Sequence, residues 1–143
     1  MNIALLKQAL LRDEGLRFRP YLCPAGKRTI GVGRNLDDRG ITKAEAMMLL
    51  DNDISLVESE LDHELPWWRA LPDGPDRALA NMAFNMGVPR LLGFRKMLEA
   101  LKRGDYATAA KEAQNSQWAQ QVGDRAQRVV SLIMGRDDYE HNG

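Results

Sequence analysis

The stretch "DEGLRFRPYLCPAGKRTIGVGR", residues 13–34, changes the sequence pattern from helical to extended and decides the expected fold. Before it, apolar residues recur at helical spacing from Ile3, and Gly15 supplies a stop. Within it, "RFRPYL" alternates, "CPAGK" is typical of a turn, and "RTIGVG" is a glycine-rich β-type run. We therefore expect Glu14 in the last turn of a helix, followed by a small hairpin. Cys23 then falls in the hairpin turn and Thr29 on the return strand.

The rest of the chain predicts helices. "GITKAEAMMLLDNDISLVESEL" keeps helical spacing, and Thr42 with Glu45 forms a capping box at its beginning. Farther along, proline, glycine and aspartate residues separate several shorter helices. The pattern predicts an α+β fold with two lobes in a single domain of residues 1–143. The expected hairpin lobe covers about residues 13–58, and the helical lobe covers about residues 59–143 together with an N-terminal helix of residues 1–12.

Composition excludes several classes of protein. The 20 basic residues balance the 20 acidic ones, which argues against a dedicated nucleic-acid binder. A single cysteine excludes an intramolecular disulfide, and two histidines, His63 and His141, exclude a multi-histidine metal site. Charged residues interrupt the first segment from Lys7 onward, too early for a membrane span or a secretory signal. We expect a monomer with no metal, no cofactor and no membrane anchor.

Glu14 is the first candidate for chemistry. An acid beside the negative end of a helix holds its proton more readily, and a protonated carboxyl can donate to the leaving oxygen of a glycosidic bond. Such cleavage also needs a second group across the scissile bond, and a hairpin turn can place one there. Cys23 occupies that turn, and the Thr29 hydroxyl can hold a water. A small, inert, buried thiol is the competing interpretation of Cys23.

The spacing of these residues, Glu14, eight residues, Cys23, five residues, Thr29, resembles that of the phage lysozymes of the T-even type. These enzymes form glycoside hydrolase family 24 and are also called endolysins or muramidases. The resemblance continues in order through "DEGLR", "TIGVGR", "GITKAEA", "ALANMAFNMG", "GFRKML", "SQW" and "DRAQRV", and it covers nearly the whole chain.

The resemblance implies a lysozyme-like fold and hydrolysis of the β-1,4 bond between N-acetylmuramic acid and N-acetylglucosamine in peptidoglycan. It implies that Glu14 is the general acid and that Thr29 positions the water. Cys23 stands where most relatives have an aspartate. The same resemblance implies three cleft residues: Phe84, Asn85 and Arg125. Of these, Arg125 matches the arginine that pairs with the catalytic glutamate in the family. It also implies that the protein accumulates in the host cytoplasm until a holin releases it to lyse the cell wall.

Two departures from the family pattern carry expectations of their own. A neutral thiol in place of a carboxylate forfeits about a hundredfold in rate unless something compensates. Cys23 then activates water as a thiol or thiolate, with Lys27 and Arg28 lowering the pKa of the thiol, or it attacks the sugar covalently. The second departure is Arg34, which stands where relatives commonly have histidine, and we expect it to pair with Asp53 unless both are independent surface charges. Two rival functions stay open: a lytic transglycosylase and a catalytically silent cell-wall-binding module.

Overall fold

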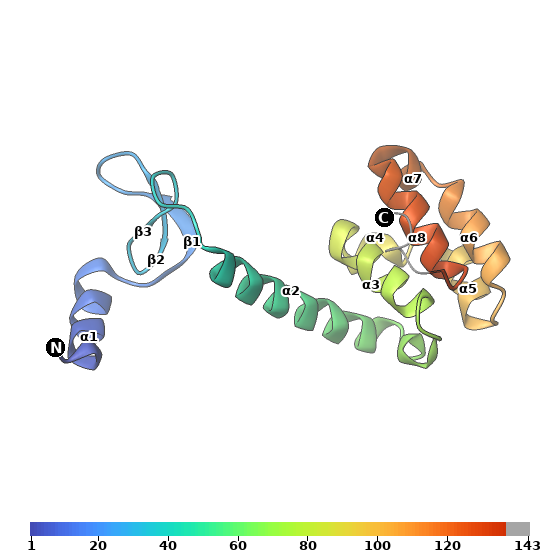
Figure 1. Cartoon of the computed structure of the whole chain (residues 1–143), viewed down its shortest axis with the longest axis horizontal. Coiled ribbons are helices and arrows are strands. Elements are labelled where there is room, and N and C mark those ends of the chain that lie inside the picture. The colour runs from blue at the N-terminus through green and yellow to red at the C-terminus, as the bar shows by residue number, and fades with distance from the viewer. Residues whose placement is uncertain (137–143) are drawn as a thin grey trace. The chain divides into compact units, whose positions relative to one another are not determined.

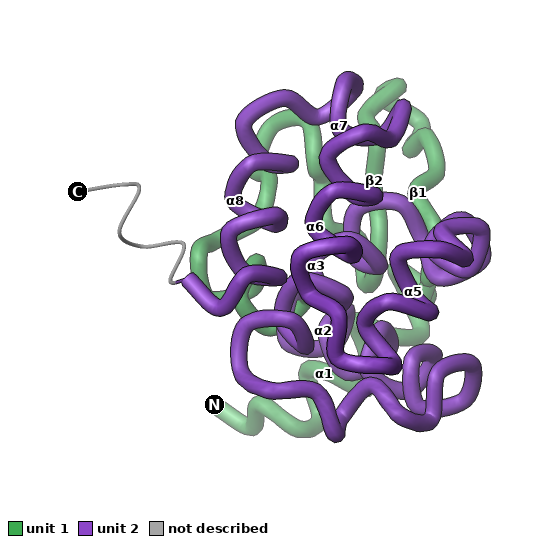
Figure 2. The backbone as a smooth tube through the Cα atoms, turned by 90° about the vertical axis from the view of Figure 1, so that its right-hand side faces the viewer, with its two compact units in different colours: residues 1–49 green, residues 50–143 purple. Residues whose placement is uncertain are grey.

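The computed structural model describes residues 1–136, and it contains a small antiparallel sheet near the N-terminus and a larger set of helices (Figure 1). The chain folds into two compact units, residues 1–49 and the residues from 50 onward (Figure 2). This architecture confirms the expected lysozyme-like α+β fold. The expected lobe boundary near residue 58, and the grouping of residues 1–12 with the helical lobe, stay predictions.

The first unit begins with helix α1 (Ile3–Glu14). Asn2 caps it, because its Oδ1 accepts a hydrogen bond from the Leu5 amide at 3.1 Å, and Gly15 ends it with a φ of +79°. Strand β1 (Arg17–Leu22) pairs antiparallel with β2 (Arg28–Gly31), which pairs antiparallel with β3 (Arg34–Asn35). Because β1 lies at the edge of this sheet, it tolerates Pro20, which has no amide proton to donate.

Helix α2 (Lys43–Glu64) begins with the expected capping box. The Glu45 amide donates to Thr42 Oγ1 at 3.2 Å, and the Thr42 amide donates to Glu45 Oε1 at 2.9 Å. The structure pairs Arg34 with Glu45, at 2.6 Å between Nη2 and Oε2, instead of with the expected Asp53. The reason is that the capping box already holds the Glu45 carboxylate at the beginning of the helix, whereas Asp53 lies about two turns farther along. The sheet is therefore tied to the first turn of α2.

This ion pair predicts an acid-sensitive contribution to stability. The Arg34 guanidinium, helped by Thr42, lowers the pKa of Glu45 to about 2. A carboxyl with a lowered pKa stabilises the fold above the pKa of the unfolded chain, and that stabilisation is lost as the pH falls through the folded value. Glu45→Gln should therefore lower Tm by about 2–5 °C at pH 7 and make no difference below about pH 2. Thermal unfolding from pH 7 to pH 2 measures this, with Glu99→Gln on the exposed surface as the matched control; equal Tm losses at both ends of the range would contradict it.

The second unit is built from short helices around one apolar core. They are η1 (Trp68–Ala70), α3 (Pro75–Met86), α4 (Val88–Leu91), α5 (Arg95–Lys102), α6 (Tyr106–Gln114), α7 (Gln117–Val122) and α8 (Asp124–Ile133). Large side chains that are almost fully buried fill the core: Leu61, Leu79, Met82, Leu91, Met97, Leu101, Trp118, Val129, Leu132 and Ile133. Trp118 is 1% exposed and packs in this core.

The turn after α2 is held by a compact polar cluster. The Trp68 indole donates to Asp62 Oδ1 at 2.7 Å, and Arg69 forms ion pairs with both Asp62 and Glu58 while its guanidinium lies 4.7 Å from the Trp68 ring centroid. These contacts hold Trp68 at the corner of the chain that follows α2. Within residues 1–136, none of the helices has the length and apolarity that crossing a membrane requires.

Candidate active site

Glu14 is the last residue of α1, and its carboxylate lies against the backbone of the turn between β2 and β3. Gly33, in that turn, has a φ of +69°, and a Cβ atom added there would lie 2.9 Å from Glu14 Oε2. The chain therefore needs glycine at position 33 for two reasons, the left-handed backbone and the room for the carboxylate. The beginning and the end of the stretch "DEGLRFRPYLCPAGKRTIGVGR" are thus in contact, through Glu14 and Gly33.

Cys23 and Thr29 lie together at the turn between β1 and β2. The Cys23 amide donates to the Lys27 carbonyl at 2.9 Å, and the Gly26 amide donates to the Cys23 carbonyl at 2.8 Å, which closes the turn. Thr29 is 4% exposed and is the buried polar side chain of the described residues. Its hydroxyl donates to the Lys27 carbonyl at 2.9 Å. The structure therefore brings these two predicted residues together around the backbone of Lys27.

Hydrogen bonds lower the pKa of the half-buried Cys23 thiol. The backbone of Lys27 makes the largest contribution, burial opposes it, and the backbone of Ala25 and the hydroxyl of Thr29 add smaller contributions in the same direction. Because a hydroxyl has a single proton, Thr29 donates to the sulfur only when it releases the Lys27 carbonyl.

The expectation that the charges of Lys27 and Arg28 lower the thiol pKa is not what the structure shows. Lys27 Nζ lies 3.2 Å from Asp38 Oδ1, and Arg28 Nη2 lies 2.6 Å from Asp37 Oδ1, so both cations are neutralised by acids from the loop after β3. Asp37 also accepts the Arg28 amide at 2.7 Å, and the Arg28 side chain and amide lower the pKa of this carboxyl. Sequence reasoning missed these two ion pairs, although the acidic pair "DD" at positions 37–38 indicated them.

The contact between Gly33 and Glu14 yields a paired prediction. Gly33→Ala should move the carboxylate of Glu14, which is the flexible end of a side chain, and lower by about tenfold the rate of a reaction that uses Glu14 as its acid, while the chain stays folded. Gly31→Ala is the matched control, because Gly31 has nearly the same φ, +71°, with no atom within 4 Å of the added Cβ. Both variants carry the same backbone strain, so Tm should fall equally. Equal activities of the two variants would contradict a role for the Gly33–Glu14 contact.

The helical unit places Arg125 and Phe84 on one cavity. Arg125 Nε, on α8, donates to Asn81 Oδ1 on α3 at 2.9 Å, and Phe84 lies one turn after Asn81 with 43% of its surface exposed. The cavity has a volume of about 380 Å³, and Leu50, Ile54 and Ala80 add apolar wall. Sequence reasoning missed Asn81, whose signal was its position three residues before Phe84 on the same helical face. The expected pairing of Arg125 with Glu14 stays a prediction.

Asn85 has a different role from its neighbour Phe84. Its side-chain Oδ1 accepts a hydrogen bond from the indole of Trp118 at 2.8 Å. The buried indole proton therefore has a partner, as such a donor requires. Asn85 is an exposed residue, but it is not among those that line the cavity of Phe84 and Arg125.

Comparisons with known proteins identify relatives of this chain. The model of the phage lysozyme family matches residues 12–137. The chain is 32% identical to the SAR-endolysin of Escherichia phage Mu, over 92% of this chain and 81% of that protein. It is 28% identical to the probable T4-type lysozyme 1 of Dictyostelium discoideum, over 92% of this chain and 94% of that protein.

A longer relative matches as well. The chain is 31% identical to the pre-baseplate central spike protein Gp5 of Enterobacteria phage T4, over 90% of this chain, but it spans only 27% of that protein. All three matches extend across both compact units, and the family model begins before Glu14 and ends beyond α8. The chain belongs to the phage lysozyme family.

Proposed function

We propose that this protein is a muramidase that hydrolyses the β-1,4 bond between N-acetylmuramic acid and N-acetylglucosamine in peptidoglycan and so lyses bacterial cell walls. Membership of the phage lysozyme family supports the substrate. The observation that carries the chemistry is the placement of Cys23, in the turn between β1 and β2, beside Thr29 at the beginning of β2, with the Cys23 amide and the Thr29 hydroxyl both donating to the Lys27 carbonyl. The cavity beside Arg125 and Phe84 offers a surface for the glycan strand on the helical unit.

In the proposed mechanism, Glu14 donates its proton to the glycosidic oxygen as the bond from that oxygen to the anomeric carbon breaks. A water held by Thr29 attacks the anomeric carbon from the opposite face and gives its proton to the sulfur of Cys23. The product sugar then has inverted configuration. The lowered pKa of Cys23 supports this use of the sulfur, because a larger fraction of thiolate is present at a given pH to accept the proton.

A covalent route uses the same residues. The Cys23 sulfur attacks the anomeric carbon while Glu14 protonates the leaving oxygen, and a water then releases the sugar from the thioether with retained configuration. The proposal favours the water route, because the buried Thr29 hydroxyl beside the sulfur offers a hydrogen-bonding partner to an attacking water.

Digestion of purified peptidoglycan, with mass and anomer analysis of the first products, tests the proposal. We expect reducing ends with the mass of one added water and with inverted configuration. Anhydro-sugar products would identify a lytic transglycosylase, and retained configuration would identify the covalent route. Wall binding with no released product would identify a silent binding module and overturn the proposed function.

A further inference from the structure

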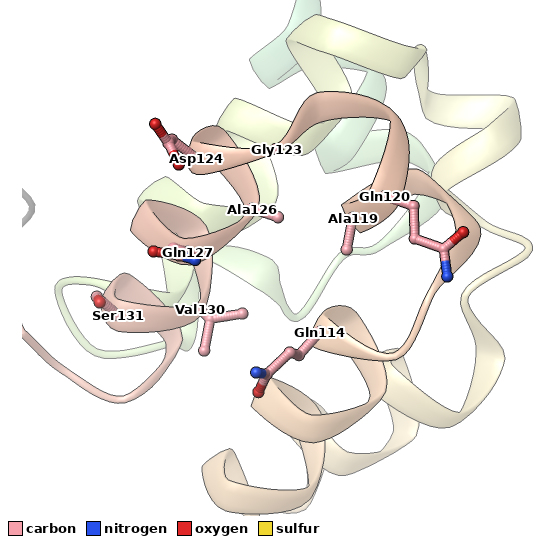
Figure 3. A pocket seen from close by; sticks show the side chains of 9 residues that line it. All are labelled: Gln114, Ala119, Gln120, Gly123, Asp124, Ala126, Gln127, Val130 and Ser131. Atoms are coloured by element: carbon pink, nitrogen blue, oxygen red, sulfur yellow. The ribbon is translucent and has the colours of Figure 1, made fainter.

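A second cavity of the helical unit, about 500 Å³ in volume, lies among α6, α7 and α8 (Figure 3). Figure 3 shows the side chains of Ala119, Ala126 and Val130 turned toward the space between the helices. Three glutamines also line the cavity: Gln114, Gln120 and Gln127. We call it the glutamine-rimmed cavity, and its volume falls within the range of roughly 300–1,000 Å³ that is usual for small-ligand sites.

The glutamine-rimmed cavity is separate from the one beside Arg125. Successive residues of an α-helix are rotated by about 100° about its axis, so Gln127 lies about 200° from Arg125 on α8. Arg125 faces α3 through its hydrogen bond to Asn81, whereas Gln127 and Ser131 face α6 and α7. The candidate active-site residues therefore do not line this cavity.

The lining suits a neutral ligand that carries an amide and a short apolar group. Among residues 1–136, the side-chain amides of the three rim glutamines make no hydrogen bond within the protein, so each retains a donor and an acceptor for a ligand. An acetamido group matches this arrangement, because its methyl fits the alanine and valine floor while its carbonyl and N–H pair with glutamine amides. Ser131 and Asp124 offer acceptors for sugar hydroxyls.

Charge distinguishes between the parts of peptidoglycan that carry amides. The cavity has no lysine or arginine in its lining and has one carboxylate, Asp124. Stem peptides carry free carboxylates, which this lining repels, whereas the acetamido sugars of the glycan backbone present no charge at the acetamido group.

We propose that the glutamine-rimmed cavity binds an N-acetylated amino sugar of a glycan strand, as an anchoring site outside the active site. The proposal rests on the proposed function for the identity of the polymer. A second contact with the same insoluble polymer raises the effective concentration of scissile bonds near Glu14. The anchoring site therefore acts on intact walls and contributes nothing to cleavage of fragments too short to reach both sites.

The test uses the isotope-labelled full chain with Glu14→Gln, so that the sugar is not cleaved, and chitotetraose as the probe. The side-chain amide NMR signals of Gln114, Gln120 and Gln127 should shift with saturation. Gln127→Ala and Gln114→Ala should each weaken this binding about tenfold through the loss of hydrogen bonds. Gln117→Ala, on α7 but outside the lining, is the matched control and should bind as before.

A soluble stem peptide is the second probe and should leave the same signals unmoved. The proposal is overturned if chitotetraose shifts none of the three amides, if the stem peptide shifts them instead, or if Gln117→Ala weakens binding as much as Gln127→Ala. The proposed function fails separately, when the wild-type chain releases no sugar product from peptidoglycan. The NMR signals of residues beside Phe84 report sugar bound at the other cavity, so binding at each of the two cavities is measured independently.

Discussion

Replacing Glu14 by glutamine is expected to lower the initial rate of peptidoglycan hydrolysis by about 10²–10⁴-fold, the usual contribution of a positioned general acid. Glutamine keeps the shape of the side chain beside Gly33 but has no proton that it can transfer to the leaving oxygen. The sugar oxygen would then leave as an alkoxide, which is a poor leaving group. The loss of turbidity of purified cell walls measures the rate, and sedimentation with the walls measures binding, which should be retained.

Asp13→Asn is the matched control for this prediction. Asp13 is the preceding carboxylate on α1, and it is exposed beside Arg12 at the helix surface. Its neutralisation changes the charge at the helix end in the same way and removes no group that the mechanism uses. If Asp13→Asn lost as much activity as Glu14→Gln, the effect would come from the charge of the helix end and not from proton donation. If Glu14→Gln kept full activity, Glu14 would not be the acid.

The fold was predictable where the signals are local. Gly15 and the pair Thr42–Glu45 act on backbone groups within four residues of themselves, and the structure confirms both predictions. The alternation of "RFRPYL" and the glycines of "RTIGVG" likewise identified the hairpin. The last helix departs from the usual preference for aspartate at the cap: Asp124 is its first residue, and Gly123 occupies the cap.

The partners of the site residues were less predictable, because they come from distant parts of the sequence. Asn81 binds Arg125 across 44 positions, and Asn85 binds Trp118 across 33. A polar residue on a helix indicates that it needs a partner, but the partner depends on how the helices pack. Glu45 shows the same limit over a shorter range. Its capping role was visible, and its ion pair with Arg34 depends on the path of the chain between β3 and α2.

Cys23→Ala is the second substitution with a large expected effect, a loss of about a hundredfold in the rate of wall hydrolysis. Alanine leaves the turn intact, since the hydrogen bonds that close it come from the backbone of Cys23, Gly26 and Lys27. It removes the sulfur, and with it the group that takes the proton of the attacking water and the negative charge opposite the developing positive sugar. Circular dichroism and Tm should be close to those of the wild type. If Cys23→Ala kept full activity, Cys23 would be an inert, half-buried thiol with no catalytic role.

Cys23→Asp separates the charge of the sulfur from its other properties. Aspartate is ionised throughout the neutral range, so this variant should stay within about tenfold of the wild-type rate at pH 7. The wild type needs its thiol to ionise, and hydrogen bonding from the backbone of Lys27 lowers the pKa of that thiol below its usual range. The rate of the wild type should therefore rise with pH along a limb whose midpoint lies below that of an ordinary thiol, and Cys23→Asp should lack the limb. If the same rise in rate with pH persisted in Cys23→Asp, a group other than residue 23 would be responsible for it, because aspartate completes its ionisation several pH units lower.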